Sequence, residues 1–398
     1  MILKNDFIEK IWNILVFCIG FFNVLVVSTL SHFSLVHSIN NLLRIAFIGI
    51  SFFFIITMRN KIKIWTILFL LFMIVLLSTY FSNSNIFIMP FFFIFALINR
   101  DIKPTMRSLI IGISSASILV VSLALLNIIP NYSFVLNGRL RSGLGFLRST
   151  SLSGLMLGVV CGFLYISKNI TFKIIFFILL TNFFIFLATD GRASFASIFV
   201  VVVGCFFFDK FKEKKMLNRL LTFFSITTLL IGIIASIFVA SNFSSYPFLQ
   251  NLNEMTSGRF SWWYTYLLNY DVKLFGQPII RVTTTAVRQD PSLHMMILDN
   301  GYLSLLLENG LLMFITIINA FFLLIIYFSK NKNLTGLFIL IIHFINLIVE
   351  NGSLSYSRNM LLFCISTVIT EKNSAKDESE IFIRKKTEIG GTIENVIN

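Results

Sequence analysis

Long apolar runs separated by short polar junctions dominate the pattern of this chain. A helix needs about 20 mostly apolar residues to cross a bilayer, and its backbone polar groups must be satisfied within the segment. The alternation that is typical of a membrane barrel is not visible. The pattern therefore predicts an all-α, polytopic transmembrane helical bundle of about twelve spans, of which the fourth and the last are short. The runs cover residues 11–31, 39–57, 62–79, 86–98, 108–129, 151–167, 173–189, 193–208, 220–241, 300–328, 334–349 and 359–370.

Composition supports lipid as the solvent for most of the chain. Of its 398 residues, 57% are hydrophobic and 13% are charged, and the mean hydropathy is +0.87. A soluble domain carries roughly twice that charged fraction. We expect one transmembrane domain over residues 1–370 and a polar cytoplasmic tail over residues 371–398. The four cysteines lie inside apolar runs, so they are predicted to be small core residues.

Basic residues at alternate junctions predict the orientation. Lys4 and Lys10 precede the first run, and every second junction after it is also basic. On this side of the membrane Lys outnumbers Arg by about three to one, which is the ordinary pattern of cytoplasmic segments. We therefore expect a multi-pass protein of the cytoplasmic membrane with both termini in the cytoplasm.

The basic residues of the outer side are different, because all but one of them are Arg. An outer excess of Arg runs against the usual topology signal and needs another reason. Arg offers a planar fork of donors that binds phosphate or carboxylate at two points, and it keeps its charge. The set predicts an anionic ligand, a phosphate or diphosphate, at the outer boundary. The alternative is that these residues pair with lipid headgroups or local acids. The set is Arg139, Arg141, Arg148, Arg192, Arg259, Lys273, Arg281, Arg288 and Arg358.

Two outer segments, 130–150 and 242–299, are too long to be simple connections. The second has about 58 residues and lies between the ninth and tenth spans. Its middle, from about 257 to 270, is predicted to be an amphipathic helix lying on the membrane. Trp262 and Trp263 would then lie at headgroup level or stack on sugar faces. His294 is the one His in a plausible outer site.

Two carboxylates near the tenth span are candidate chemical groups. Asp299 opens that span and is either a helix N-cap or a functional group. Glu308 would lie about two turns into the span, where a carboxylate is costly unless it faces a cavity. Asp190 precedes Arg192 closely, so this Arg either pairs with it or reaches a phosphate. No nucleotide-binding loop or metal-binding motif is visible, so no cofactor is expected.

Several segments, taken in order, resemble the O-antigen polymerase and ligase superfamily, and most closely the polymerases of capsular or exopolysaccharide repeat units. They are Arg141-Ser-Gly-Leu-Gly-Phe, Thr189-Asp-Gly-Arg192-Ala-Ser, Ser257-Gly-Arg259 with Trp262 or Trp263, Leu274-Phe-Gly276 and Asp299-Asn-Gly-Tyr302-Leu. The resemblance covers about residues 139–315. In the ligase branch the position of Asp299 is usually His, so Asp here favours a polymerase.

The resemblance implies transfer of a growing glycan from undecaprenyl diphosphate to the next lipid-linked oligosaccharide on the outer face of a bacterial membrane. A chain-length regulator is a candidate partner, and no nucleic acid is expected. A ligase for finished glycan and a lipid-linked oligosaccharide flippase stay open as alternatives. The implied roles are catalysis by Asp299 or Glu308, diphosphate binding by Arg141, Arg192 and Arg259, and substrate binding by Arg139, Trp262, Trp263, Tyr302 and His294.

Overall fold

A computed structural model describes residues 2–57, 62–136, 139–167, 169–211, 215–256, 258–283, 286–287, 290, 292 and 295–371. His294, Arg288 and the predicted tail beyond Glu371 lie outside this part. The described chain is helical with one small hairpin, so the predicted helical class is confirmed. Its helices are α1 (Ile2–Val26), α2 (Ser34–Thr57), α3 (Ile62–Ser82), α4 (Ile88–Ala96), α5 (Ile102–Leu125), α6 (Thr150–Ile166), α7 (Phe172–Thr189), α8 (Arg192–Lys210), α9 (Lys215–Asn242), α10 (Pro247–Met255), α11 (Arg259–Asn269), α13 (Gly301–Leu307), α14 (Leu311–Lys330) and α15 (Leu334–Val349), with 3-10 turns η1 (Thr29–His32), η2 (Asn351–Leu354) and η3 (Met360–Phe363).

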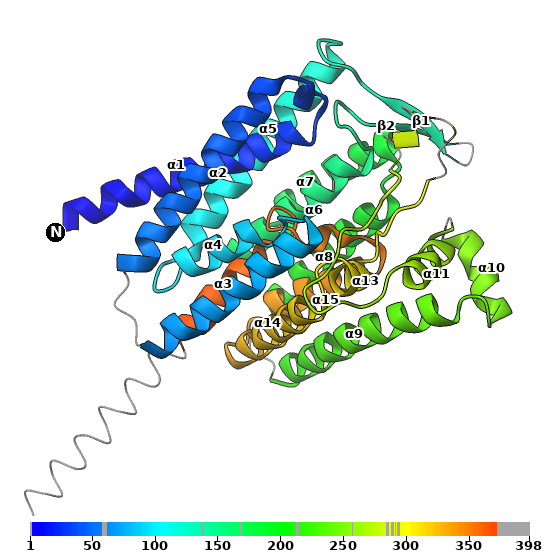
Figure 1. The fold of residues 1–398 in the computed structure, drawn as a ribbon. Helices are drawn as coiled ribbons and strands as arrows, with labels where there is room; N and C mark the ends of the chain where they lie inside the picture. The colour runs from blue at the N-terminus through cyan, green and yellow to red at the C-terminus, as the bar shows by residue number, and fades with distance from the viewer. Residues whose placement is uncertain are drawn as a thin grey trace, which may run out of the picture.

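Seven of the described helices are long and apolar enough to cross a membrane, by length and composition, as expected for a multi-pass membrane protein. They are α1, α2, α3, α5, α7, α9 and α14. Figure 1 shows the long helices side by side, with the hairpin, α10 and α11 at one end and the N-terminus at the other. We call these the hairpin end and the opposite end.

The hairpin falls in the first predicted outer loop. Strands β1 (Ser133–Leu136) and β2 (Arg139–Ser142) pair antiparallel, with Phe134 opposite Arg141. This register puts Arg139 and Arg141 on the same face of β2, because side chains alternate along a strand. The hairpin thus presents two arginines together, close to the N-terminus of α6.

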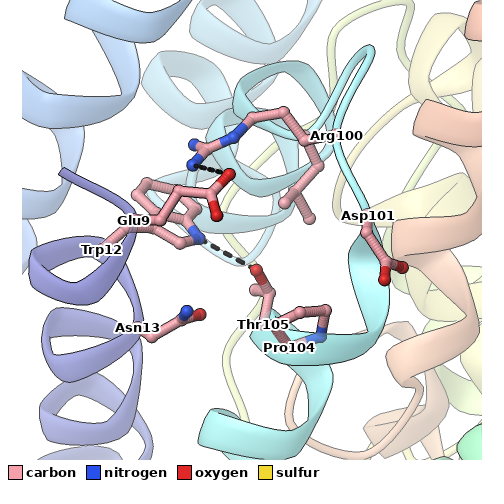
Figure 2. Close-up of a pocket in the computed structure, with 8 residues that line it drawn as sticks. Glu9, Trp12, Asn13, Arg100, Asp101, Pro104 and Thr105 are labelled. Atoms are coloured by element: carbon pink, nitrogen blue, oxygen red, sulfur yellow. Dashed lines mark hydrogen bonds and ion pairs between the residues drawn. The ribbon is translucent and has the colours of Figure 1, made fainter. Parts of the chain in front are cut away.

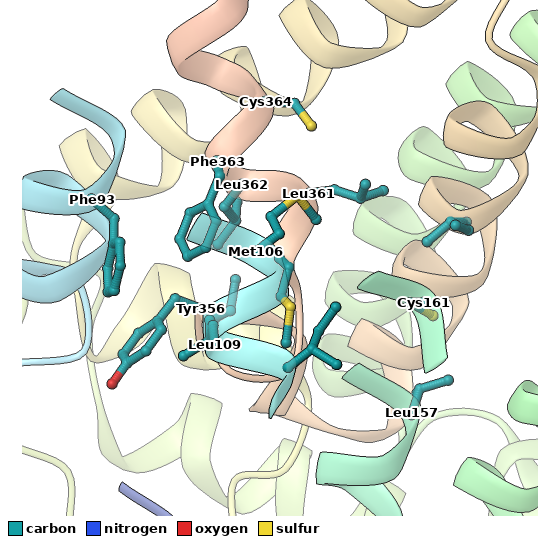
Figure 3. Close-up of a cluster of buried hydrophobic side chains, with 14 of the residues drawn as sticks. Phe93, Met106, Leu109, Leu157, Cys161, Tyr356, Leu361, Leu362, Phe363 and Cys364 are labelled. Atoms are coloured by element: carbon teal, nitrogen blue, oxygen red, sulfur yellow. The ribbon is translucent and has the colours of Figure 1, made fainter. Parts of the chain in front are cut away.

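The two short apolar runs form partial helices. α4 has nine residues, which at 1.5 Å per residue reach about 14 Å, less than half of a hydrocarbon core of about 30 Å. The last helical segment, Met360–Glu371, is also short. The two pack together, with the rings of Phe93 and Phe363 4.7 Å apart (Figure 3). Neither is long enough to cross the membrane by itself.

The predicted tenth span, 300–328, is broken, and the expectation of one continuous helix there was wrong. α13 ends at Leu307 and α14 begins at Leu311. Gly310 lies between them at φ +90°, a conformation that glycine adopts without strain. The loop after α11 supplies partners at the break: Gln277 N–H donates to the Glu308 carbonyl, and Leu311 N–H donates to the Lys273 carbonyl. Glu308 therefore lies at the hairpin end of the 20-residue α14, outside the span rather than two turns inside it.

The long outer loop folds as its own layer at the hairpin end. α11 confirms the helix predicted for residues 257–270, but its aromatic face is buried in protein instead of lying in the lipid interface. Trp263 is 1% exposed and Tyr266 is fully buried. Both pack against Leu298 and neighbouring leucines of α13 in a small second core. The expectation that Trp263 lies at headgroup level was therefore wrong.

A glycine face on α6 holds the chain that follows α15. Gly154, Gly158 and Gly162 recur every four residues, so they share one side of the helix. Arg358 lies against Gly154 and Gly158, and the sulfur of Met360 lies against Gly162. Small residues let backbones approach closely, which is a main source of helix packing in lipid. This contact sets the position of Arg358.

We predict that Gly158→Ala loosens this contact. An added Cβ would lie 2.5 Å from the carbonyl oxygen of Ser357 and 2.6 Å from the Cα of Arg358, and both are backbone atoms. Such overpacking costs about 1–3 kcal/mol. The melting temperature in detergent should fall clearly. Gly49→Ala is the matched control, since no atom lies within 4 Å of a Cβ at Gly49. Equal melting temperatures for the two variants would contradict this packing.

Candidate functional site

Asp190 holds three arginines together at the hairpin end. It ends α7 in a left-handed conformation with φ 49°. Its carboxylate lies 3.0 Å from the Arg141 guanidinium, 3.1 Å from that of Arg192 and 3.8 Å from that of Arg139. One carboxylate cannot neutralise three guanidinium groups. Arg139 and Arg192 are also half-exposed or more, at 48% and 60%, so they remain available to an outside anion.

Asp299 is held by Arg259 and Trp263 of α11. The Arg259 Nε lies 3.1 Å from one carboxylate oxygen, and the Trp263 indole N–H donates to the other at 3.1 Å. Burial raises the pKa of Asp299, while the Arg259 charge and the Trp263 hydrogen bond oppose this increase. Asn300 caps α13 by accepting from the Leu303 N–H, so Asp299 is not the N-cap. The Asp299 carboxylate is therefore held in place by two partners, and helix capping does not explain its presence.

Glu308 binds Arg281, a residue of the long outer loop. The Arg281 guanidinium donates to both the Glu308 carboxylate and the Ser304 hydroxyl, and the latter donates to Glu308 at 2.9 Å. The Arg281 Nε has no partner among the described residues. Both hydrogen bonds are accepted by Oε2 of Glu308, and its Oε1 has no hydrogen bond to a described residue, whereas Asp299 uses both of its oxygens.

Glu350 and Arg358 form a fourth pair, 3.3 Å apart, beside α6. The groups described so far are neighbours. A Cβ at Gly191 would meet the Ser153 hydroxyl of α6, and the Arg358 guanidinium covers Gly154 one residue further on. Arg259 also donates to the Val349 carbonyl at the end of α15, next to Glu350. The Asp190 and Glu350 groups therefore flank the N-terminal turn of α6, and the Arg259–Asp299 pair lies next to Glu350.

Arg148 is the arginine without a carboxylate. It immediately precedes α6, and no ion pair or hydrogen bond of its side chain with another described residue is present. Burial lowers the pKa of the Arg148 guanidinium, and the nearby charges of Arg358 and Arg281 lower it further. Part of the side chain nevertheless reaches solvent. An unpaired cation that is repelled by two others is where an added anion gains most.

We call the whole set the arginine cluster. It contains seven arginines and four carboxylates and so carries a net charge of +3. Each carboxylate has an arginine partner, and the surplus lies on Arg148 and around Asp190. The members are Arg139, Arg141, Arg148, Arg192, Arg259, Arg281 and Arg358 with Asp190, Asp299, Glu308 and Glu350.

The structure brings most of the sequence-predicted residues together, but with different surroundings. Arg139, Arg141 and Arg192 meet at Asp190, whereas Arg259 lies beside Asp299. Tyr302 is 1% exposed, and its hydroxyl donates to the Phe344 carbonyl, so it packs inside the bundle with no face open to a substrate. Trp262 is partly exposed on α11, and His294 lies outside the described residues.

The sequence signal for the other members was the outer arginine set itself. Arg148, Arg281 and Arg358 all belong to it, but nothing in their spacing singled them out. Their importance depends on which acidic side chains lie close enough to pair with them in the folded chain. The sequence offered the pairing of Asp190 with Arg192 as one alternative, but only the fold adds Arg139 and Arg141 to Asp190 and pairs Glu350 with Arg358.

No group of three or more His, Cys, Asp or Glu side chains that could hold a metal occurs among the described residues. A small cavity lies at the opposite end, between α1 and the start of α5 (Figure 2). Arg100 pairs there with Glu9 at 3.4 Å and packs over the Phe54 ring. The cavity has a volume of about 40 Å³, which holds one or two water molecules but no sugar, so the cavity is not a substrate site.

Comparison with known protein families, with curated proteins and with solved structures finds no match for this chain. The interpretation of the site therefore depends on its own geometry.

We predict that Arg148→Gln and Arg358→Gln change stability in opposite directions. Arg148→Gln removes a charge that is repelled by its neighbours, so the melting temperature should rise by about 1–3 °C. Arg358→Gln leaves the partly buried Glu350 without its partner, so the melting temperature should fall by several degrees. Thermal unfolding of both variants in the same detergent measures this. A fall for Arg148→Gln would mean that it has a structural partner.

Proposed function

We propose that the chain is a polysaccharide repeat-unit polymerase of the bacterial cytoplasmic membrane. In this proposal it transfers the growing glycan from undecaprenyl diphosphate to the next lipid-linked oligosaccharide. The bundle crosses the membrane about twelve times, with both termini in the cytoplasm and the hairpin end facing outward. The observation that carries the proposal is the arginine cluster, which leaves a positive charge of +3 at one end of an apolar bundle.

The reaction would proceed by displacement at the anomeric carbon of the donor sugar. An acceptor hydroxyl oxygen forms the new bond to that carbon, and the bond from the carbon to the diphosphate oxygen breaks. The diphosphate leaves with the electron pair, and the hydroxyl proton passes to a carboxylate. Preorganised arginines stabilise the charge that develops on the leaving group, and they do so most strongly where water is scarce. Arg148, Arg141 and Arg192 fit this role because their charge exceeds what Asp190 neutralises.

Asp299 is the best candidate for the base. Burial raises the pKa of its carboxyl above the ordinary value of an aspartate, which makes the carboxylate a better proton acceptor. Arg259 and Trp263 fix its orientation. Glu308 is the second candidate, with Arg281 and Ser304 bound to one of its two oxygens, Oε2.

The sugars and the partner are assigned less directly. Trp262 is a half-exposed aromatic residue of α11, and Arg139 is the exposed arginine of β2, so both could contact the glycan. Aromatic rings suit sugar faces, since both are flat and apolar. A chain-length regulator would be the protein partner of such a polymerase.

The first test is the glycan left in cells after deletion of the chain. A polymerase deletion should leave single repeat units on lipid. A ligase deletion would instead leave long unattached polymer, and a flippase deletion would leave single units on the cytoplasmic face. Chemical analysis of the lipid-linked and surface glycan distinguishes the three outcomes.

The same cells allow a matched pair of variants to be compared. Arg141→Lys keeps the charge but loses the fork that holds Asp190 through two nitrogen atoms, so polymer should be lost at a normal protein level. Arg107→Lys, an exposed position on α5, should restore normal polymer. Full polymer from Arg141→Lys would count against the cluster as the reaction site.

The second test is the pH dependence of polymer formation in membranes. The base must be unprotonated, so the rate should rise with pH through the pKa of Asp299. Because burial raises this pKa, the rise should lie above the ordinary aspartate value of about 3.9. Asp299→Asn should abolish activity at every pH. An unchanged rising limb in that variant would assign the base to another group.

A further inference from the structure

Arg44 lies five residues inside the predicted span 39–57, whereas Lys63 and Lys173 lie at the very start of theirs, and the arginine cluster does not include Arg44. It lies ten residues into α2, about 15 Å from the start of that helix, which is near the middle of a hydrocarbon core of about 30 Å. It is on the inward face of α2, because Asn40, Phe47 and Ser51 are buried on the same side at helical spacing. Arg44 therefore points into the bundle at mid-depth.

The Arg44 side chain is half-buried and has no partner among the described residues. Its Nε is buried without a hydrogen bond, and no ion pair is formed. A charged side chain at this depth costs several kcal/mol unless it is paired or hydrated, and such residues mark ligand paths by default. A structural role would need an acid or a carbonyl acceptor within hydrogen-bonding distance, and the Arg44 side chain bonds to neither among the described residues.

A second unpartnered polar group lies beside it. Tyr356 is 5% exposed, and its hydroxyl is buried without a hydrogen bond. Tyr356 packs on Phe93, and Phe93 packs on Phe47, which lies one helical turn after Arg44 on α2, so the hydroxyl and Arg44 belong to the same part of the bundle. Figure 3 shows the hydroxyl pointing away from the labelled apolar cluster, while the ring packs on Phe93 at 5.2 Å. Two donors are thus left without an acceptor in one place.

The N-terminus of α4 completes the site. Phe93 of α4 packs on Phe47 of α2 at 4.3 Å, and Arg100 after α4 lies over Phe54 at 4.0 Å. The sequence separation is the same in both pairs. The two segments therefore run in the same direction, and Arg44 is level with the first turn of α4. No side chain caps that turn. Its available backbone donor is the Met89 N–H, because Pro90 has no N–H and the N–H groups of Ile88 and Phe91 already donate to backbone carbonyls. This donor lies at the positive end of a partial helix, which favours an anion.

We propose that Arg44, the Tyr356 hydroxyl and the first turn of α4 form an anion site at the middle of the bundle, and that it binds a phosphate group. Arg44 would supply the charge-assisted hydrogen bonds, and Tyr356 would donate one more. The phosphate could belong to a polyprenyl lipid or to free phosphate. This site is separate from the arginine cluster and does not depend on the proposed function, which only suggests the lipid probe.

The site can be tested by ligand-induced thermal stabilisation of the purified full chain in lipid nanodiscs. We expect undecaprenyl diphosphate to bind wild type, and Arg44→Gln to weaken that binding at least tenfold. Tyr356→Phe should weaken it severalfold. Arg107→Gln, which removes an exposed charge from α5, should bind as wild type. Inorganic phosphate is the second probe: stabilisation that Arg44→Gln abolishes would show that the site takes the free anion as well.

Ligand-free stability provides the internal check. Without ligand, Arg44→Gln should melt at the same or a higher temperature, because it removes a half-buried charge that has no partner among the described residues. Equal binding of both probes by wild type and Arg44→Gln would overturn the proposal. A large loss of ligand-free stability would also overturn it, since Arg44 would then have a structural partner. Polymer formation in cells is a separate measurement. If a variant loses polymer while the binding of both probes is unchanged, the result bears on the proposed function and not on this site.

Discussion

The lack of water inside a bilayer is the constraint on which the rest of this structure depends. Backbone groups at that depth must find partners within the protein, so helices can be interrupted only where protein covers the break. The interruptions are at α4, at the segment after α15 and at the junction of α13 and α14. Each is packed by another part of the chain: Phe363 on α4, the glycine face of α6 under Ser357–Met360, and the loop around Gly276 at the junction. The broken segments are also where the unusual charges lie.

The same constraint explains why the arginines matter. Seven arginines at one end of the bundle are opposed by four carboxylates, and the remaining charge has no partner within the described chain. In water such a surplus would be screened within about 10 Å. At the edge of an apolar bundle the screening is weaker, and an anion placed there is bound more strongly. Arg148 shows this most clearly, because Arg358 and Arg281 repel it and no carboxylate among the described residues pairs with it.

Arg44 repeats the argument at greater depth. The cluster and Arg44 are linked through one segment, residues 350–360, which supplies Glu350 and Arg358 to the cluster and Tyr356 to the deeper site. The glycines of α6 fix the position of this segment. A single packing contact thus sets the position of groups in both sites, and a substitution such as Gly158→Ala should disturb both together.

The sequence alone determined the helical class, the membrane environment and the arginine-rich end, because hydrophobic runs and charge type are local properties. It also located the α11 helix and the Asp190–Arg192 pair, because the residues within each of them are close together in the chain. It did not determine the break at Glu308–Gly310, because that break depends on a loop thirty residues earlier supplying hydrogen bonds. Nor did it distinguish Arg148 and Arg44 from the other basic residues. Whether a basic side chain has an acidic partner depends on which acids its neighbours pair with in the folded chain. Those pairs are set by the tertiary structure.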